Sequence, residues 1–577
     1  MLFRSYHVDN VLLHVVSAIM LWRLLRRLEV PGAYFAAALF ALHPVMVESV
    51  AWVTERKNVL SLVFYLLAMW VYLLHFLPSR DRRAWVLALT LFLGALFSKT
   101  VTASFPAAVL LILWWKNDRF PRREVLPLAP FFLAGIVLST VTGYLETYHV
   151  GAAGENVVEL QLGFEQRCLI AGRAIWFYVG KLLWPHPLSF IYPRWNEIAT
   201  PTAIQWALPA MVAGAAAALF ALRERLGRGP LVAWLLFCGT LFPALGFVNV
   251  YPMRFSFVAD HFQYHASIAL IALVGAIASH TARRDSTALV AIVRRAFAVI
   301  LVAGLGTLTW NRAHVYRDSE TLWRDTLAKN PDSWMVNTNL ANVVVRTTPP
   351  AIDEAEVLYR RALELAPNLP ETQTDVGMVD GMRGRMDEAL QHLDEALRIN
   401  PTYAPAYYHR GQVRSRMREL DRAIDDFEHA LRYAPGFAEA HFRLAMALRV
   451  QATDAHQRFV EAHDPADTKL AEEKFFAAVD HLRSAVAADE GNGAAHAELG
   501  LCLIRLGRPD EAIRELREAV RIDPSYAEAW TNLGGALYQT GRIEEAADAF
   551  ARALQINPNL AAARRGAQAS SARKGAR

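Results

Sequence analysis

Six polar side chains that could do chemistry lie in one short stretch, FALHPVMVESVAWVTERKN, which runs from Phe40 to Asn58 between two apolar segments. These residues are His43, Glu48, Glu55, Arg56, Lys57 and Asn58. A charged side chain at the centre of a membrane helix costs about 2.5–3.5 kcal/mol, so such residues tend to mark a functional site. Taken singly, each also has a structural explanation, because Lys and Arg near helix ends reach lipid headgroups and His or Asn bonds a neighbouring helix. Their role therefore depends on the side of the membrane that the turn faces.

Composition divides the chain into a membrane part and a soluble part. The chain has 577 residues, of which 54% are hydrophobic. It is therefore too long and too apolar to be one soluble domain. Residues 1–310 hold long apolar runs with charges in short patches, whereas residues 311–577 are rich in Ala, Glu, Arg and Leu. We therefore expect an all-α protein with a polytopic membrane domain at 1–310, followed by a soluble helical part.

Charge and cysteine content argue against several other classes of protein. The formal net charge of +5 is small for this length, so nucleic-acid binding is not indicated. The three cysteines, Cys168, Cys238 and Cys502, lie far apart and fit no metal-ligand spacing. We expect them to be small buried hydrophobic residues, and we predict neither a metal site nor a cofactor.

Apolar runs predict about ten membrane spans, since a spanning helix needs about 20 apolar residues. They are residues 8–28, 33–53, 58–77, 84–97, 101–115, 126–147, 204–222, 230–250, 262–279 and 288–309. Segment 168–184 is interrupted by Arg173 and Lys181, so it either spans or lies in the interface as an amphipathic helix.

The distribution of Lys and Arg in short loops predicts the orientation. With 168–184 in the interface, one face receives all the basic clusters, which lie at 23–27, 80–83, 116–123, 223–228 and 283–295. If 168–184 spanned, the last two clusters would fall on the outside. The first arrangement is favoured, and it places Met1, the turns at 54–58 and 98–100, the segment 250–264 and the soluble part outside.

Prolines recur along the soluble part with a period of about 34 residues, which is the tetratricopeptide period. They are Pro331, Pro367, Pro401, Pro435, Pro524 and Pro558. The long interval before Pro524 resolves into two repeats if one carries an insertion near 452–472. We predict a connecting helix at 311–331, six repeats over 332–558 and a basic disordered tail at 559–577.

Internal marks support the repeats. Gly377, Gly411, Gly500 and Gly534 occupy the small position where the first helix of a repeat meets the second. Arrays of this kind form a concave surface that binds peptide or protein segments. Tyr408, Asn532 and Tyr538 are expected to line that protein-binding groove, and the alternative is that the array is only a spacer.

Several motifs occur in a fixed order along the chain. They are NVLLHVVSAIMLWRLLRRL, ALFALHPVMVESVAWVTERKNVLS, ALFSKTVTASFPAAVLLILWW, YPRW, PALGFVNVYPMRFSFVADHFQY and YRDSETLWRDTLAKNPDSW. Together they resemble bacterial relatives of the transmembrane and tetratricopeptide-repeat-containing (TMTC) O-mannosyltransferases, of the GT-C glycosyltransferase fold. The resemblance covers nearly the whole chain, and the ordered set is specific although each motif alone is weak.

The resemblance implies a transferase that takes a sugar, expected to be mannose, from a polyprenyl-phosphate carrier in the membrane. The acceptor would be a hydroxyl, expected to be Ser or Thr of an exported protein or peptide that the repeats bind. It also implies an active site at the outer membrane face, and a multi-pass protein of the bacterial plasma (inner) membrane with its repeats on the extracytoplasmic side.

On this resemblance, cations would stabilise the departing phosphate of the donor. The candidates for donor phosphate binding are Arg56, Lys57, Lys99 and Arg254, with His261 and Tyr264 as hydrogen-bond donors to phosphate or sugar. The acceptor hydroxyl also needs a general base, which is normally a carboxylate.

In one respect the sequence departs from the family. Members of this fold begin with a further membrane helix and an outer loop that carries the acidic catalytic residue, whereas MLFRSYHVDNVLLH matches the region after that loop. We therefore expect the usual base to be absent from this chain, which leaves Glu48, Glu55 and Asp260 as candidates.

A non-catalytic, membrane-anchored scaffold for protein assembly in the cell envelope is the alternative function. A transporter is disfavoured because the spans show no clear inverted repeat. The gathering of polar residues on the outer face favours the transferase, because a pure anchor has no need of them.

Overall fold

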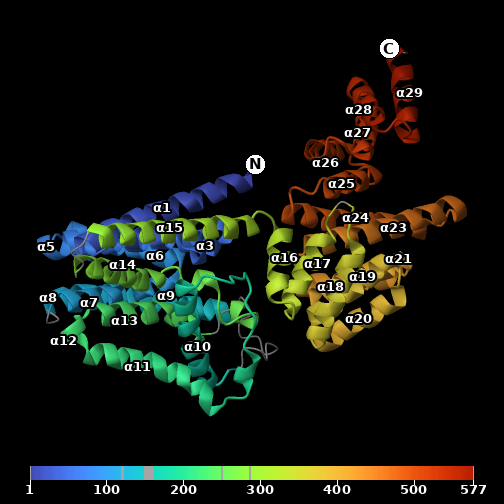
Figure 1. Cartoon of the computed structure of the whole chain (residues 1–577). Helices are drawn as coiled ribbons and strands as arrows, with labels where there is room; N and C mark the ends of the chain where they lie inside the picture. Colours follow the sequence, from blue (N-terminus) through green and yellow to red (C-terminus); the bar gives the residue numbers. More distant parts are fainter. Residues whose placement is uncertain are drawn as a thin grey trace. The chain divides into compact units, whose positions relative to one another are not determined.

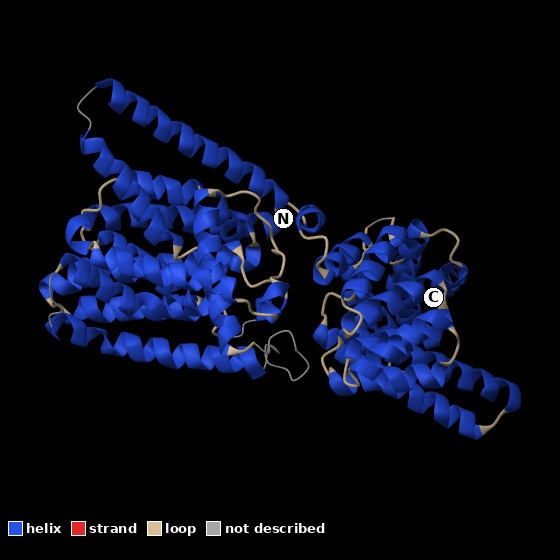
Figure 2. Cartoon of the chain, turned by 60° about the horizontal axis from the view of Figure 1, so that its bottom comes forward, coloured by secondary structure: helices blue, strands red, loops and turns tan. Residues whose placement is uncertain are grey.

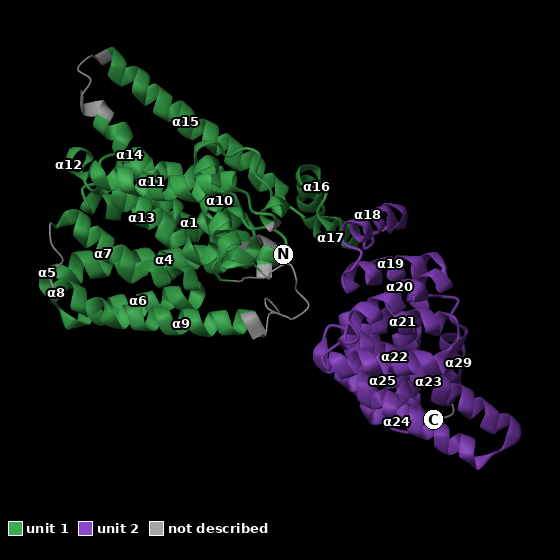
Figure 3. Ribbon diagram, turned by 90° about the horizontal axis from the view of Figure 1, so that it is seen from below, with its two compact units in different colours: residues 1–343 green, residues 344–577 purple. Residues whose placement is uncertain are grey.

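The computed structural model describes residues 2–117, 122–148, 162–248, 251–284, 288–347 and 349–575. Two compact units make up the chain, Met1–Val343 and Val344–Arg577, which Figure 3 colours separately. Over the described residues both units consist of helices and loops with no strand, as Figure 2 shows. The predicted all-α class is therefore confirmed.

The first unit is a bundle in which long helices run alongside one another (Figure 1). Its helices are α1 (Leu2–Arg27), α2 (Ala33–Leu42), α3 (Val47–Ala51), α4 (Arg56–Val71), α5 (Leu77–Ser79), α6 (Arg82–Ser98), α7 (Phe105–Lys116), α8 (Arg122–Val125), α9 (Ala129–Tyr148), α10 (Phe164–Leu183), α11 (Ala207–Ala221), α12 (Arg223–Leu226), α13 (Gly229–Leu241), α14 (Ser267–Arg284), α15 (Ala288–Val315), α16 (Ser319–Lys329) and α17 (Trp334–Val344). Short 3-10 turns between them include η2 (Val53–Glu55), η4 (Thr100–Ser104) and η11 (Asp260–Gln263).

Five described helical segments are long and apolar enough to cross a membrane: His7–Arg27, Val53–Ser79, Arg123–Glu146, Ala203–Ala221 and Leu289–Val315. Ala33–Leu42 and Pro44–Ala51, bent by 54° at their break, make a sixth if they form one span. Thr100–Lys116, Gly229–Ala244 and Ser267–His280 are shorter apolar helices. The first unit is thus a membrane domain, while the predicted total of ten spans stays a prediction.

The helix α10 occupies the ambiguous segment 168–184, and it is amphipathic. Leu169, Ala174 and Tyr178 are buried on one side of it, while Arg173 pairs with Glu197 at 2.6 Å near the surface. This pattern suits a helix with one face on the protein and one on an interface. Whether it spans or lies flat stays open.

Small residues let α2 and α14 cross closely. Gly32, just before α2, has a φ of 72°, in the left-handed region that favours glycine. A Cβ atom on Gly275 would lie 2.9 Å from the Ala36 Cβ, closer than side chains normally approach. The crossing holds α14 against α2, and η11 with its polar side chains lies just before α14 in the chain.

The second unit is a succession of paired helices. They are α18 (Ile352–Leu365), α19 (Pro370–Arg383), α20 (Met386–Ile399), α21 (Ala404–Arg416), α22 (Leu420–Tyr433), α23 (Ala438–Ala462), α24 (Pro465–Ala488), α25 (Gly493–Arg505), α26 (Pro509–Ile522), α27 (Ala527–Gln539), α28 (Ile543–Ile556) and α29 (Ala561–Gly575). The insertion near 452–472 lengthens one pair, because α23 and α24 have 25 and 24 residues where the neighbouring repeat helices have 13 or 14.

The end of the chain differs from the prediction of a disordered tail. Residues 561–575 form α29, in which Ala563 is fully buried. A Cβ atom on Gly566 would lie 2.3 Å from the Phe550 ring, so the bare glycine lets α29 lie directly on α28. The small residues that suggested disorder therefore make a close packing surface, and alanine is the best helix former.

Glycines set the spacing between the two helices of a repeat. Cβ atoms added at Gly377, Gly411, Gly500 and Gly534 would lie 2.5–2.8 Å from the Leu or Phe side chain that packs on each glycine from the second helix. For Gly534 that side chain is Phe550. The glycines are thus needed for close helix approach, as the sequence predicted.

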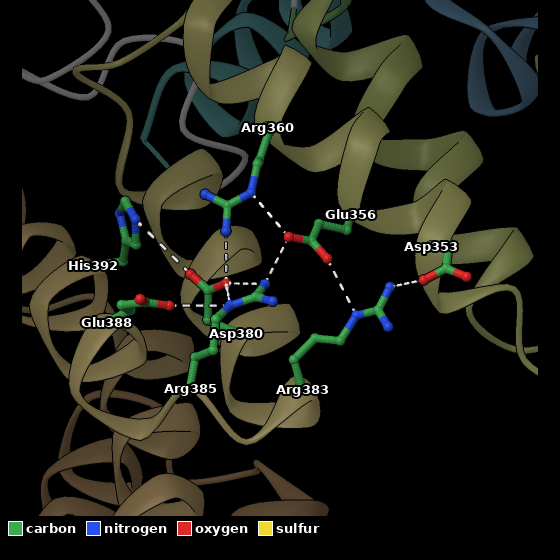
Figure 4. A network of polar contacts seen from close by, with 8 residues as sticks. All are labelled: Asp353, Glu356, Arg360, Asp380, Arg383, Arg385, Glu388 and His392. Carbon is green, nitrogen blue, oxygen red and sulfur yellow. Dashed lines mark hydrogen bonds and ion pairs between the residues drawn. The ribbon is translucent and has the colours of Figure 1, made fainter.

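A network of ion pairs joins α18 to α19 and α20 (Figure 4). The Asp380 carboxylate is fully buried and accepts from Arg360 Nη2 at 2.8 Å and from Arg385 Nε at 2.9 Å. Glu356 bridges the same two arginines, at 3.1 Å and 2.6 Å, and also pairs with Arg383. Burying a carboxylate is costly unless it is paired, so this network fixes how the first helices of the unit pack.

The close approach at Gly534 gives a testable prediction with a matched control. Gly534→Ala is expected to destabilise the end of the array by about 1–3 kcal/mol, because its methyl group would overlap the Phe550 ring. Hydrogen exchange over residues 527–575 of the full-length protein measures the free energy of local opening.

The neighbouring Gly535 is the control, because nothing lies within 4 Å of a Cβ atom added there. Gly535→Ala is expected to stabilise α27 by up to about 1 kcal/mol through helix propensity alone. Equal exchange in the two variants would contradict the packing role of Gly534.

Candidate functional site

Two lysines from different parts of the chain meet on one carboxylate. Glu55 ends the turn η2 and is 1% exposed. Its Oε1 lies 3.3 Å from Lys57 Nζ, and its Oε2 lies 3.0 Å from Lys99 Nζ, which arrives from the junction of α6 and η4. Burial lowers the pKa of Lys99, and the Glu55 carboxylate opposes that shift by favouring the charged ammonium. Glu55 and Lys99 are 44 positions apart in the sequence, and the fold brings their side chains together.

Glu48, His261 and Asn58 form a second polar cluster beside the first. Glu48 accepts from the His261 Nδ1 at 2.8 Å and from the His261 backbone N–H at 3.2 Å. Asn58 Nδ2 donates to Ser49 Oγ and to the His261 carbonyl, both at 2.9 Å. Glu48, Ser49, Asn58 and His261 are each at most 8% exposed, so buried hydrogen bonds join α3, the start of α4 and η11.

Asp260 lies next to this cluster with a partner that the sequence analysis did not identify. Its Oδ1 accepts from the Tyr192 hydroxyl at 2.9 Å, and Asp260 is 1% exposed. Burial first, and then the neighbouring Glu48 carboxylate, raise the pKa of Asp260 to about 7. Arg312, Tyr192 and Lys181 oppose that rise in pKa by favouring the charged form.

The remaining predicted phosphate-binding residues are less closely grouped. Arg56 Nη2 lies 3.3 Å from Asp9 on α1, in an exposed pair beside Lys57. Arg254 packs over the Trp334 ring at 5.3 Å. Tyr264 is fully buried, and its hydroxyl shares a 2.7 Å hydrogen bond with His14 Nδ1. Because Tyr264 has this protein partner in the core, the structure offers its hydroxyl no open path to a phosphate or sugar.

A large apolar cavity adjoins these polar clusters. Its volume is about 790 Å³, and it lies between α1, α4, α7, α13 and α14. On α4 its lining begins at Leu62 and Tyr65, and on α14 it extends from near His265 to His280. At 1.5 Å of rise per residue the cavity is about 20 Å long, and Leu62 lies about 10 Å along the helix from Glu55. A cavity of this length and apolar lining is of a size that takes an apolar chain.

Several residues that complete the site escaped the sequence analysis. Tyr192 belongs to the YPRW motif that supported the resemblance, so its presence there was a usable signal. Phe190 stacks edge-on against Trp52, and Arg312 approaches from the end of α15, 13 residues before its partner Asp325. Neither Phe190 nor Arg312 belongs to a recognisable sequence pattern. Their contacts depend on how the loops fold, which the sequence does not reveal.

The predicted groove residues all lie on first helices of repeats. Tyr408 on α21 accepts from Gln412 Nε2 at 2.8 Å and packs on Phe437. Asn532 and Tyr538 lie on α27, where both are half-buried, and Arg573 of α29 stacks on the Tyr538 ring at 5.2 Å. That these residues bind a protein segment stays a prediction.

Comparison with known proteins gives two kinds of match. Residues 4–144 match the family described as dolichyl-phosphate-mannose-protein mannosyltransferase. Tetratricopeptide repeat families match residues 382–417, 404–437, 464–527 and 505–561.

Curated relatives agree with the first match. The chain is 38% identical over 97 residues to protein O-mannosyl-transferase Tmtc1 of Drosophila melanogaster, which is 16% of this chain and 11% of that protein. It is 40% identical over 96 residues to Tmtc2 of the same organism, again 16% of this chain and 10% of that protein. The match therefore spans about a tenth of the length of these relatives.

Solved structures resemble the repeat helices. YrrB, a tetratricopeptide protein described as having an unusual peptide-binding site, is 23% identical and covers 36% of this chain and 97% of its own, with a TM-score of 0.30. MamA is 22% identical and covers 32% of this chain and 96% of its own, with a TM-score of 0.26. In combining a mannosyltransferase-like membrane segment with tetratricopeptide repeats, the chain is similar to the TMTC O-mannosyltransferases, which confirms the resemblance found in its sequence.

Proposed function

We propose that the protein transfers a sugar, expected to be mannose, from a polyprenyl-phosphate carrier to a hydroxyl of an exported protein. The observation that carries this proposal is the pair of ammonium groups at Glu55, placed at the end of a helix whose following turns line the apolar cavity. A polyprenyl phosphate has the matching chemistry, an anionic head on a long apolar chain. The similarity to mannosyltransferases supports the same donor class.

The lysines would bind the donor phosphate and stabilise its charge as it leaves. In the transfer, the bond between the sugar C1 and the phosphate oxygen breaks, and its electron pair stays on the phosphate. The acceptor oxygen forms the new bond to C1 and gives up its proton. Lys57 and Lys99 can serve the phosphate because each ammonium has three donors and Glu55 occupies only one. Charge-assisted hydrogen bonds of this kind are the strong ones.

Of the candidate carboxylates, Asp260 is best suited to accept the acceptor's proton. Glu55 is held by two lysines, and Glu48 accepts two hydrogen bonds from His261. Both carboxylates are therefore already occupied by protein donors. Asp260 has a pKa of about 7, which is where a general base works best near neutral pH.

The repeats would present the acceptor. Tetratricopeptide arrays bind extended protein segments, and on the predicted orientation the array lies on the extracytoplasmic side of a bacterial plasma membrane, where exported proteins emerge. Tyr408, Asn532 and Tyr538 are the residues we assign to that binding surface. The alternative, a scaffold without catalysis, would retain this acceptor binding but lack binding of the lipid donor.

Removal of Lys99 tests donor binding. Lys99→Ala is expected to weaken binding of a short-chain polyprenyl phosphate by about 10- to 100-fold, which corresponds to the 1.5–3 kcal/mol of a hydrogen bond to a charged group. Calorimetry on the protein in nanodiscs measures this affinity. Lys574→Ala is the control, because Lys574 lies on α29 of the second unit, where it pairs with Glu544.

Loss of Lys99 also removes one of two partners of the buried Glu55, so folding needs its own control. Lys99→Ala combined with Glu55→Gln removes the unpaired charge and is expected to recover thermal stability without recovering affinity. Full affinity in either variant would count against the assignment of Lys99 to the phosphate.

The pKa of Asp260 predicts how transfer depends on pH. Below pH 7 the carboxyl is mostly protonated and cannot accept a proton, so the rate is expected to fall about tenfold per pH unit there and to level off above pH 7. Initial rates of sugar transfer between pH 5 and 9 measure this profile. Asp260→Asn is expected to lower the rate by about 10²- to 10⁴-fold. A flat profile, or an active Asp260→Asn variant, would remove Asp260 from this role.

A further inference from the structure

The helix α16, which follows the membrane domain in the chain, is fastened to the segment that carries Tyr192. Lys329 Nζ at the end of α16 donates to the Leu188 carbonyl at 2.8 Å. The next residue, Asn330, donates from Nδ2 to the Ile191 carbonyl at 3.3 Å. The Trp323 ring stacks edge-on against Phe190 with 5.4 Å between ring centroids. Residues 188–192 are thus held from α16 by both hydrogen bonds and ring packing.

The same helix also fixes a buried cation. Asp325 of α16 accepts from Arg312 Nη1 at 2.8 Å, and Lys329 pairs with the same carboxylate at 2.7 Å. The Arg312 side chain is only 7% exposed, and its second nitrogen Nη2 reaches the Tyr316 hydroxyl at 3.3 Å. Arg312 is therefore held in one orientation rather than extended into solvent.

Both fastened groups act on Asp260. Tyr192 donates to the Asp260 carboxylate at 2.9 Å, and the charge of Arg312 acts on the same carboxylate. Phe190 links α16 to His261 through Trp52. The Phe190 and Trp52 ring centroids are 5.0 Å apart, and the Trp52 and His261 ring centroids are 5.7 Å apart. A chain of rings and hydrogen bonds therefore runs from α16 to the polar cluster at Glu48 and His261.

We propose that α16 is part of the active site and fixes two positioning residues: Tyr192, which orients the Asp260 carboxylate through its hydrogen bond, and Arg312, a buried cation that α16 holds on Asp325. This inference rests on the proposed function for the role of Asp260 as base, but the placement of Asp260 by α16 stands independently of it. The site is incomplete without a helix that belongs, in sequence, to the start of the soluble part.

Electrostatics explains why a buried Asp260 needs a cation such as Arg312 nearby. Asp260 is buried beside Glu48, and two carboxylates that close cannot both be charged at neutral pH without a neighbouring cation. The titratable and charged groups that face Asp260 are Glu48, Tyr178, Lys181, Tyr192, His261, Arg312 and Tyr316. Arg312 is the cation that acts most strongly on it, so loss of Arg312 is expected to raise the pKa of Asp260.

The test compares Arg312→Gln, Arg312→Lys and Tyr192→Phe in the full-length protein. Infrared titration follows the protonated carboxyl band that Asp260→Asn removes, and it needs neither donor nor acceptor. The midpoint of that band is expected to move upward by about one pH unit in Arg312→Gln and in Tyr192→Phe. Arg312→Lys keeps the charge and is expected to restore most of the wild-type midpoint.

A matched control lies on the same helix. Glu320→Gln breaks an exposed pair with Arg324 on α16 and is expected to leave the midpoint unchanged. An unchanged midpoint in both Arg312→Gln and Tyr192→Phe would overturn the inference, even if sugar transfer is observed. A shifted midpoint in a protein without any transfer activity would uphold the placement of Asp260 and overturn the proposed function instead.

The pH profile of transfer provides the second readout. Where transfer occurs, the rising limb of the profile is expected to move to higher pH in Arg312→Gln by the same amount as the infrared midpoint. A merely structural loss would lower the rate at every pH without moving the limb. A limb that stays in place while the rate falls would therefore overturn the positioning role of Arg312.

Discussion

The cost of burying a carboxylate organises one end of the membrane domain. Glu48, Glu55 and Asp260 are each at most 2% exposed, and an unpaired charge there would be far less stable than in water. Each is therefore bound by groups from distant parts of the chain: Glu55 by Lys99, Glu48 by His261, and Asp260 by Tyr192. These three pairs tie η2 to the end of α6, α3 to η11, and η11 to the segment that contains Tyr192. The polar residues are thus also the cross-links that hold the helices at this end.

Packing makes those cross-links possible at a fixed geometry. The glycine contact between α2 and α14 sets the approach of the helix that follows η11, and the cluster of Tyr72, Phe92, Phe105 and Phe131 fills the space between α4, α6, α7 and α9. Such close-packed interiors leave few voids. A cavity of about 790 Å³ is an exception, and on α4 its lining begins at Leu62, seven residues after Glu55. Shape and charge together therefore favour an amphiphilic ligand.

The sequence predicted the periodic features and missed those that depend on loops. Apolar length and the 34-residue period gave the helical class, the membrane domain and the repeats, because both are properties of local sequence. The predicted topology placed the turns at 54–58 and 98–100 on the same face, and in the structure Lys57 and Lys99 meet on Glu55, while their binding of a donor phosphate stays a prediction. The partners of Asp260 could not be predicted, since Tyr192 and Arg312 reach it from segments 68 and 52 residues away along paths set by tertiary packing. The tail was mispredicted because a small-residue composition fits both disorder and close helix contact.

Stability alone is a poor explanation for this cluster. Replacing a buried ion pair by well-packed apolar residues is often neutral or stabilising, so a helix bundle in lipid gains little by keeping one. Three buried carboxylates that share one end of the bundle, beside two lysines and a long apolar cavity, exceed what an anchor for the repeats requires.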